Sequence, residues 1–354
     1  MLHPKKSQFN LYITTFKRQV DSVIESLSTK DMSASDIKKR VEQALDPEEE
    51  EEENAVDRTT RFAYRFLQFA HSKSKSTCGV YMQTYRRMVA FMGEDALNEM
   101  QFEDVTKNWL VSFENFMAET AGKNARNIHL RNIRAVVNDA IDDEITSTYA
   151  FRRFKIRPEA TKKRSLPVEK LRMLFNFQPE AYAQKYLDMF KLIFMLIGIN
   201  VADLANLKRI EDGRIEYRRK KTHRLYSVKV EPEALELIDR LAGENWLVYI
   251  RDKYNDHNEY TRRINRELKK LGEVKRSGLG GKKTRKPLFP ELTTYWARHS
   301  WATIAASLDI PKDVIAHALG HGGNTVTDIY IDFDQSKVDE ANRKVLDWVL
   351  YGKK

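Results

Sequence analysis

Apolar residues recur every three or four positions over much of the chain, which predicts that most of it is helical. Between residues 57 and 150 few helix breakers interrupt this pattern, and four apolar faces begin at Phe62, Val80, Trp109 and Ile128. Gly93 and Gly122 fall between apolar stretches, where the chain is expected to reverse. The sequence therefore predicts a compact four-helix domain at 57–150.

A second domain is predicted at 165–335, and it contains the one clear β pattern. Helical spacing recurs in segments 168–177, 180–198, 232–242 and 258–271. Alternating β-branched and aromatic residues at 214–221 and 225–230, around a polar turn, favour a hairpin. A Gly/Lys-rich segment at 275–290 is read as a loop, either flexible surface or a strap that touches phosphate. The predicted fold class is mainly α with a small β-hairpin, an α+β second domain.

Three further segments flank these domains. A leader at 1–56 has helical stretches, with Ser33 as an expected N-cap, and ends in six adjacent Glu residues at 48–53. Mutual repulsion makes this acidic run a solvated linker, although competition with DNA for a basic surface is an alternative. Residues 151–164 are predicted to be an extended basic linker. The tail at 336–354 has an apolar stripe at helical spacing.

Composition is that of a globular protein, with 42 % apolar and 32 % charged residues. No stretch approaches the ~18 apolar residues of a membrane span, and the N-terminus lacks a secretion signal. The single cysteine, Cys78, excludes an internal disulfide and a cysteine-based metal site. We expect a cytoplasmic, nucleoid-associated protein that has no membrane partner.

The charge is unevenly distributed along the chain, whose net charge is +10. Residues 1–56 hold 8 Lys/Arg against 12 Asp/Glu, whereas the remainder holds 53 against 39. A basic body favours a nucleic-acid partner. The candidate phosphate contacts come from the helix near 123–134, the basic linker and the Gly/Lys loop: Lys123, Arg126, Arg131, Arg134, Lys162, Lys163, Arg164, Lys282 and Lys283. The helical stripe is alternatively a solvated face. The GLGGKKT segment lacks the spacing of a P-loop, so no nucleotide cofactor is expected.

The candidate chemistry is concentrated near the C-terminus, where Arg298, His321 and Tyr330 fall within 33 residues. A tyrosine attacks a phosphodiester once its proton leaves. Arginine and histidine can hold the charge that develops on the phosphoryl oxygens. These residue types together suggest covalent attack on a DNA phosphate.

The same residues carry a family resemblance. Tyr295-Trp296-Ala297-Arg298, then Leu319-Gly320-His321, then Tyr330 resemble the motifs of the tyrosine recombinases, the phage integrase family, over about residues 57–346. The form around Arg298 resembles the recombinases of Bacteroidetes and their mobile elements. The resemblance implies that 57–150 is a helical, SAM-like core-binding domain and that 165–335 is the catalytic domain, the two forming a C-shaped clamp on DNA.

It also implies a mechanism and partners. Tyr330 would be the nucleophile that forms a 3′-phosphotyrosine, Arg298, His321 and Tyr295 would stabilise the transition state, and Lys221 would be the general acid, with Lys220 as a competitor. The expected partners are double-stranded DNA with inverted-repeat core sites and three further copies in a tetramer on DNA, the free protein being a monomer. The tail at 336–354 would dock on a neighbouring protomer, or else pack in cis. No metal or cofactor is expected.

Two positions depart from the family pattern. The family's first arginine corresponds to Asn200, and its first His-x-x-Arg position is Tyr295. Loss of a phosphate-binding guanidinium weakens transition-state stabilisation. We hypothesise that Arg219 replaces it, because Arg219 lies two residues before Lys221 and so on the same face of a strand, whereas Arg218 points the other way.

Asp203 is expected to support the site or cap a helix, and His299 to pack rather than react. The departures at Asn200 and Tyr295 leave open a DNA-binding regulator that kept the fold and lost catalysis. An enzyme like a type IB topoisomerase would share the chemistry. Integration, excision and inversion are not distinguished.

Overall fold

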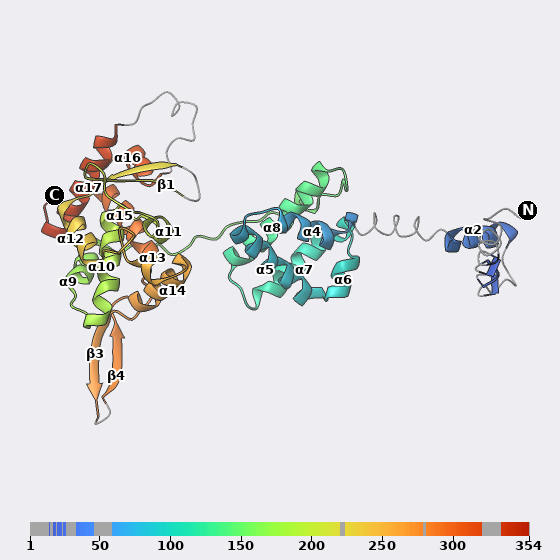
Figure 1. The fold of residues 1–354 in the computed structure, drawn as a ribbon, viewed down its shortest axis with the longest axis horizontal. Helices are drawn as coiled ribbons and strands as arrows, with labels where there is room; N and C mark the ends of the chain where they lie inside the picture. The colour runs from blue at the N-terminus through green and yellow to red at the C-terminus, as the bar shows by residue number, and fades with distance from the viewer. Residues whose placement is uncertain are drawn as a thin grey trace, which may run out of the picture. The chain divides into compact units, whose positions relative to one another are not determined.

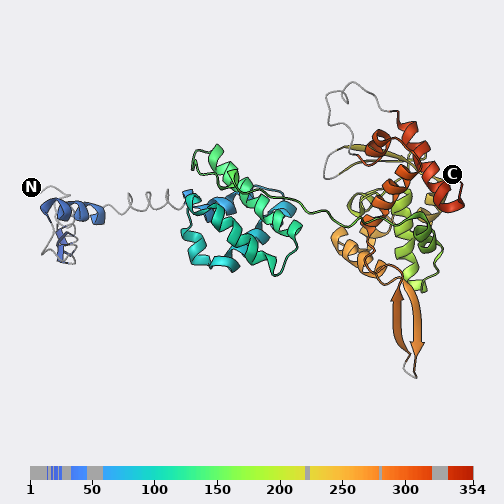
Figure 2. The same ribbon diagram turned by 180° about the vertical axis from the view of Figure 1, so that it is seen from behind.

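The computed structural model describes residues 14, 17–18, 20–22, 24–25, 33–45, 59–219, 224–278, 281–320 and 334–353, without the side chains of 37, 42–45 and 282. The chain is mostly helical with two small antiparallel hairpins, and it divides into two compact units, residues 1–161 and 162–354 (Figures 1 and 2). In the leader, the Ser33 hydroxyl accepts the Asp36 N–H at 3.2 Å at the start of α2 (Ala34–Leu45), which confirms the predicted N-cap.

The first unit is the predicted helical domain, with one more helix than the predicted four. The described helices are α4 (Phe62–His71), α5 (Lys75–Met92), α6 (Glu94–Glu99), α7 (Lys107–Ala118) and α8 (Lys123–Asp142), with short 3-10 turns at Phe102–Asp104 and Ala150–Arg152. Gly93, at φ 89°, allows the turn into the short α6, whose Leu97 is buried. An aromatic core that includes Phe62, Phe66 and Phe113 holds these helices together.

The predicted linker at 151–164 begins later than expected. Phe151 and Phe154 are buried in the core of the first unit. Asn127 on α8 donates to the Arg157 carbonyl at 2.9 Å, and the Asn124 side chain bonds both backbone groups of Glu159. The prediction of a linker was wrong at the start of this segment, because it relied on the basic charge and overlooked the two buried phenylalanines.

The second unit has α10 and α15 at its centre (Figure 1). Most of α10 is buried, and α15 buries one face, which includes Ala297, Arg298 and Trp301. Its helices are α9 (Val168–Asn176), α10 (Ala181–Met195), α11 (Val201–Leu204), α12 (Pro232–Arg240), α13 (Ile250–Lys253), α14 (His257–Leu268), α15 (Thr294–Ser307), α16 (Lys312–Ala318) and α17 (Gln335–Tyr351). Among the described residues, no helix is long and apolar enough to cross a membrane.

Two hairpins extend from this helical body. Strands β1 (Arg214–Arg218) and β2 (Leu225–Lys229) pair in antiparallel register, as the sequence predicted. Strands β3 (Gly272–Ser277) and β4 (Lys282–Pro287) form a second antiparallel ribbon. The expected loop at 275–290 is therefore wrong over most of its length, since lysine and glycine gave no β signal although the backbone pairs along six residues of each strand.

The apolar stripe of the tail packs against its own chain. Val338, Ala341, Val345 and Val349 on α17 are buried in the core of the second unit. Buried Asn342 accepts the Trp301 indole N–H at 2.8 Å and donates to the Met195 carbonyl at 3.0 Å, which links α17 to α15 and α10. In this structure the stripe is thus no free docking surface for a neighbouring protomer, because the core of the same chain already covers it.

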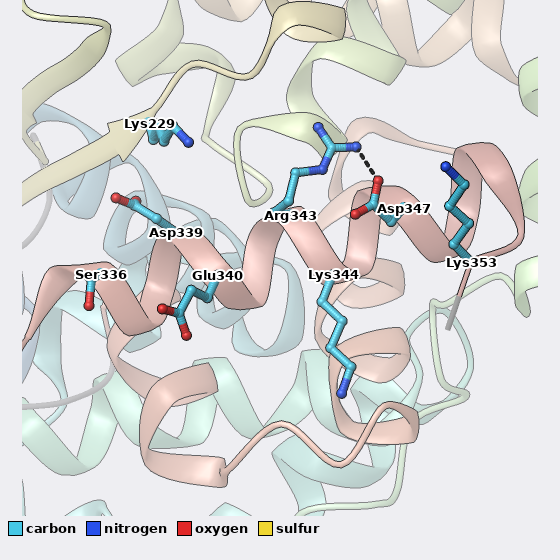
Figure 3. A pocket seen from close by; sticks show the side chains of 8 residues that line it. All are labelled: Lys229, Ser336, Asp339, Glu340, Arg343, Lys344, Asp347 and Lys353. Atoms are coloured by element: carbon cyan, nitrogen blue, oxygen red, sulfur yellow. Dashed lines mark hydrogen bonds and ion pairs between the residues drawn. The ribbon is translucent and has the colours of Figure 1, made fainter.

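The outer, charged face of α17 lines a cavity of about 670 Å³ (Figure 3). Arg343 on this face donates to Glu233 at 3.0 Å, Glu231 at 3.1 Å and Asp347 at 2.8 Å. Burial raises the pKa of Glu233, but hydrogen bonds from Arg343 and Tyr351 outweigh it and lower this pKa to about 2. This cluster fastens α17 to the start of α12.

The Glu233→Gln variant is expected to lose stability in a pH-dependent way. Because the folded-state pKa lies below the ordinary 4.5, the ionised carboxylate stabilises the fold above pH 4.5, and this contribution is lost as pH falls toward 2. We expect a loss of about 1–2 kcal/mol at pH 7 in urea unfolding, which shrinks as pH falls from 4.5 toward 3. Glu340→Gln, on the exposed face of α17, is the control. An equal loss of stability at pH 7 and at pH 3 would contradict this role of Glu233.

Candidate active site

Arg298 is buried in the second unit, with 8 % of its surface exposed. It lies in the second turn of α15, beside buried Ala297 and Trp301, so the helix holds it rigidly. Its guanidinium donates to the Gly198 carbonyl at 3.3 Å and to the Leu319 carbonyl. Burial lowers the pKa of Arg298, and neighbouring Arg219 lowers it further. These bonds fix the plane of the fork and leave other N–H donors for an anion.

The approach of α10 to Arg298 requires glycine at position 198. Gly198 has φ 70°, and a Cβ there would lie 2.3 Å from the Arg298 Cβ. Both the left-handed backbone and the missing side chain are needed, since no L side chain fits this geometry. The turn after α10 is therefore shaped around Arg298.

Arg219 lies just past the end of β1, near enough to Arg298 that its charge adds to burial in lowering the pKa of that guanidinium. Its backbone N–H donates to the Arg224 carbonyl at 2.8 Å, which extends the hairpin by one pair. The side chain is 16 % exposed, with Nε 4.0 Å from Asp203 Oδ2 and Nη1 3.5 Å from the Tyr226 hydroxyl. Arg218 is exposed. The structure thus brings Arg219 and Arg298 together, which we name the arginine pair.

Asp203 and Asn200 take different positions at this site. Buried Asp203 lies inside α11 and faces Arg219, so it supports the arginine pair and does not cap a helix. Asn200 is the N-cap residue of α11, and its side chain makes no capping hydrogen bond. A neutral amide thus stands where the family pattern has an arginine.

Tyr226 was not identified from the sequence. Its hydroxyl donates to the Leu319 carbonyl at 3.0 Å, and its ring stacks on Tyr217 with centroids 5.1 Å apart. Gly320 has φ 66°, and a Cβ there would lie 1.6 Å from the Tyr226 hydroxyl oxygen. Burial, and then the charge of Asp203, raise the pKa of Tyr217, which keeps this phenol neutral. The alternating aromatic residues of the hairpin were the only sequence signal for this contact.

The β1–β2 hairpin holds the chain on both sides of residues 321–333. Before that segment, Arg224 donates to the Gly320 carbonyl at 3.1 Å. After it, Gln335 donates to the Ser227 carbonyl at 2.7 Å, and Arg214 forms a bidentate pair with Asp339 at 2.6 and 3.1 Å. The hairpin therefore fixes the two ends between which His321 and Tyr330 occur in the sequence.

Three of the predicted catalytic residues, Lys221, His321 and Tyr330, lie outside the described residues, as does Lys220. Tyr295 is 48 % exposed, and its ring contacts the ring of His299 edge-on, with centroids 4.6 Å apart. His299 itself is exposed, contrary to the expectation that it packs, because α15 turns Ala297, Arg298 and Trp301 inward. Partial burial and then the charges of Arg164 and Arg298 lower the pKa of His299.

The predicted phosphate contacts differ in exposure. In α8, Arg131 and Arg134 are exposed, whereas Lys123 and Arg126 are half-buried, and Arg126 pairs with Glu114 at 3.9 Å. In the second unit, Lys163 and Arg164 are exposed, Lys162 pairs with Glu291 at 3.3 Å, and Lys283 pairs with Glu180 at 2.8 Å. The side chain of Lys282 is not among those described. Within the described ranges, no group of three or more His, Cys, Asp or Glu side chains is arranged to hold a metal ion.

Comparison with known proteins gives a domain match and a fold. Residues 60–156 match the phage integrase SAM-like domain. No curated protein matches the sequence. The fold is similar to that of a lambda integrase dimer bound to a COC′ core site, at 15 % identity and a TM-score of 0.56, over 77 % of this chain and 96 % of that one.

Two further solved structures are similar at the same identity. A lambda integrase tetramer bound to a Holliday junction has 15 % identity and a TM-score of 0.55, over 77 % of this chain and 78 % of that one. The Tn1549 transposon integrase in complex with a circular intermediate DNA has 15 % identity and a TM-score of 0.55, over 80 % and 98 %. At an identity this low, the structural similarity shows a shared fold alone.

The close approach of Gly198 to Arg298 predicts that one added methyl group destabilises the fold. Gly198→Ala must displace Arg298 and strain the backbone, so we expect the free energy of unfolding to fall by about 2–4 kcal/mol. Gly213→Ala is the control, because Gly213 also has a positive φ of 72° but a Cβ there meets nothing within 4 Å. That variant is expected to lose only about 1 kcal/mol. Equal losses in thermal unfolding would show that the contact with Arg298 does not constrain position 198.

Proposed function

We propose that this chain, whose phage integrase SAM-like domain and integrase fold support its assignment to the tyrosine recombinase family, is a site-specific recombinase that cuts and rejoins double-stranded DNA. The observation that carries the proposal is the arginine pair. Arg298 donates to the carbonyl of Leu319, two residues before His321, and Arg219 contacts the Tyr226 hydroxyl, which bonds the same carbonyl. Burial lowers the pKa of Arg298, and the charge of Arg219 acts on it and lowers it further. Like charges are not brought together in a half-buried site unless an anion or a carboxylate offsets them.

A DNA phosphate is the anion that suits this pair. The Asp203 carboxylate lies 4.0 Å from Arg219, beyond hydrogen-bonding distance. Arg298 donates to two backbone carbonyls and interacts with the Tyr226 hydroxyl, and none of these groups is a carboxylate that would offset its charge. A phosphodiester that bridges both guanidinium groups would complete the charge balance, since each presents a planar fork that matches two phosphate oxygens. We therefore assign to Arg219 the role of the family's first arginine.

The proposed reaction uses the residues that the family resemblance supplies. Tyr330 forms a bond to phosphorus as the bond from phosphorus to the 5′-oxygen breaks, which leaves a 3′-phosphotyrosine and a 5′-hydroxyl. The phenol loses a proton and Lys221 donates one to the leaving oxygen, so no net proton is consumed. Arg298, Arg219 and His321 hold the phosphoryl charge, and Tyr295 adds a hydrogen bond. The phosphotyrosyl bond retains the energy needed for rejoining.

The proposed partners follow from the fold and the charge. We propose that the exposed Arg131 and Arg134 of α8, and Lys163 and Arg164 of the second unit, bind the phosphate backbone of the DNA. The similar integrases include a dimer on a core site and a tetramer on a Holliday junction. By analogy, four copies of this chain would assemble on DNA that carries inverted repeats.

A second candidate is a DNA-binding regulator without catalysis. Asn200 favours it, because a neutral amide at the family's arginine position binds phosphate weakly unless Arg219 compensates. This candidate predicts DNA binding with no covalent intermediate, which separates it from the recombinase in one assay.

The proposed chemistry predicts a covalent protein–DNA complex. Nicked duplexes, made from the inverted repeats beside the protein's own gene, should trap wild-type protein because the cut fragment diffuses away. Tyr330→Phe should bind the same DNA and form no complex on a denaturing gel, since it lacks the hydroxyl. Complex formation by Tyr330→Phe would refute the assigned nucleophile. Binding without a complex in wild type would favour the regulator.

The arginine pair predicts unequal effects of two adjacent substitutions. Arg219→Ala is expected to slow cleavage by about 10²–10³-fold, the typical cost of one transition-state donor. Arg218→Ala removes the same charge from the exposed side of the strand and is expected to change the rate less than tenfold. Single-turnover rates at saturating DNA measure both. A larger defect in Arg218→Ala than in Arg219→Ala would overturn the assignment.

A further inference from the structure

The ribbon of β3 and β4 extends away from the helices of the second unit, as both ribbon views show (Figures 1 and 2). Its six residue pairs run from Gly272 opposite Pro287 to Ser277 opposite Lys282, a length of roughly 20 Å at about 3.4 Å per residue. At the base, a Cβ on Gly272 would lie 2.0 Å from the Lys286 carbonyl oxygen, so the strands approach closely there. Side chains of opposite residues share a face, and successive pairs alternate between faces.

One face of the ribbon is joined to the helical body through a single carboxylate. Arg276, Lys283 and Arg285 fall on this inner face, and all three contact Glu180, the residue before α10, at 3.2, 2.8 and 3.2 Å. Hydrogen bonding by Lys283 lowers the pKa of Glu180 despite some burial, so the carboxylate stays ionised. Arg285 also lies over the ring of Tyr182, 5.8 Å from its centroid. The inner face is thus anchored and partly neutralised.

The other face carries cations with no such anchor. Lys275 and Lys286 fall on this outer face together with Glu273 and Thr284, and all four are exposed. Glu273 is opposite Lys286 in the register, yet among the described residues neither lysine has a carboxylate within 4.0 Å. The Glu180 contacts hold the inner face toward the helical body, so Lys275 and Lys286 lie on the opposite side of the ribbon.

We propose that the outer face of the β3–β4 ribbon is a second DNA-binding surface, which contacts the duplex through Lys275 and Lys286 outside the cleavage site. A two-stranded ribbon fits the major groove, which is about 12 Å wide. Two lysines on one side of a ribbon neutralise phosphates and release their counterions. The choice of DNA as the ligand rests on the proposed function. The test does not depend on catalysis, because DNA binding is measured without cleavage.

The test compares the salt dependence of DNA binding in matched variants. The full-length protein is titrated against a fluorescent duplex of about 40 base pairs between about 50 and 200 mM salt. Relative to wild type, Lys275→Gln with Lys286→Gln should reduce the slope of log affinity against log salt by about 1.8, which is two phosphate contacts. Lys283→Gln is the control on the inner face, where Glu180 already holds the charge, and it should keep the wild-type slope.

Three outcomes decide the proposal. The expected one is a reduced slope in the outer-face variant only, with a wild-type cleavage rate at saturating DNA. A wild-type slope in the outer-face variant would overturn the DNA-binding role, even if tetramers on DNA were lost, because that loss would mark a contact between protomers. A reduction of half that size in the Lys283→Gln control, which removes half as many charges, would also overturn it, since net charge alone would explain the change. If wild type binds DNA with these slopes but forms no phosphotyrosine, the ribbon proposal stands and the catalytic one fails.

Discussion

The burial of the Arg298 guanidinium against the carbonyls of Gly198 and Leu319 is the interaction on which the rest of the site depends. A cation in the interior is stable only if its donors are satisfied and its charge is offset. Gly198 meets the first requirement by bringing the turn after α10 close to the helix that carries Arg298. Nearby Arg219 increases the need for an anion, and Asp203 meets it in part.

The same contacts connect the site to the remainder of the second unit. Arg298 and Tyr226 bond one backbone carbonyl, that of Leu319, so α15 and the β1–β2 hairpin are fixed to the same point of the chain. Arg214 then ties the hairpin to Asp339 on α17. Because α17 is itself buried through Asn342 and its apolar stripe, the hairpin and α17 together hold the chain on both sides of residues 321–333.

Much of this architecture could be predicted from local patterns, and the failures have physical reasons. Helical periodicity located most helices, and strand alternation predicted that Arg219 and Arg218 face differently. The β3–β4 ribbon was missed because it is stabilised by backbone pairing and by Glu180, about 100 residues away, rather than by apolar alternation. Tyr226 was missed for a similar reason, since its partner Leu319 is brought close only by the tertiary fold.

The most direct test of the account asks whether Arg298 and Arg219 share the charge of one phosphate. A substrate with a neutral methylphosphonate at the scissile position removes the charge that the arginine pair is proposed to hold. The account predicts that the cleavage defect of Arg219→Ala, relative to wild type, shrinks at least tenfold on this substrate, because a cation is no longer needed there. An unchanged defect on the neutral substrate would contradict it and would give Arg219 a structural role.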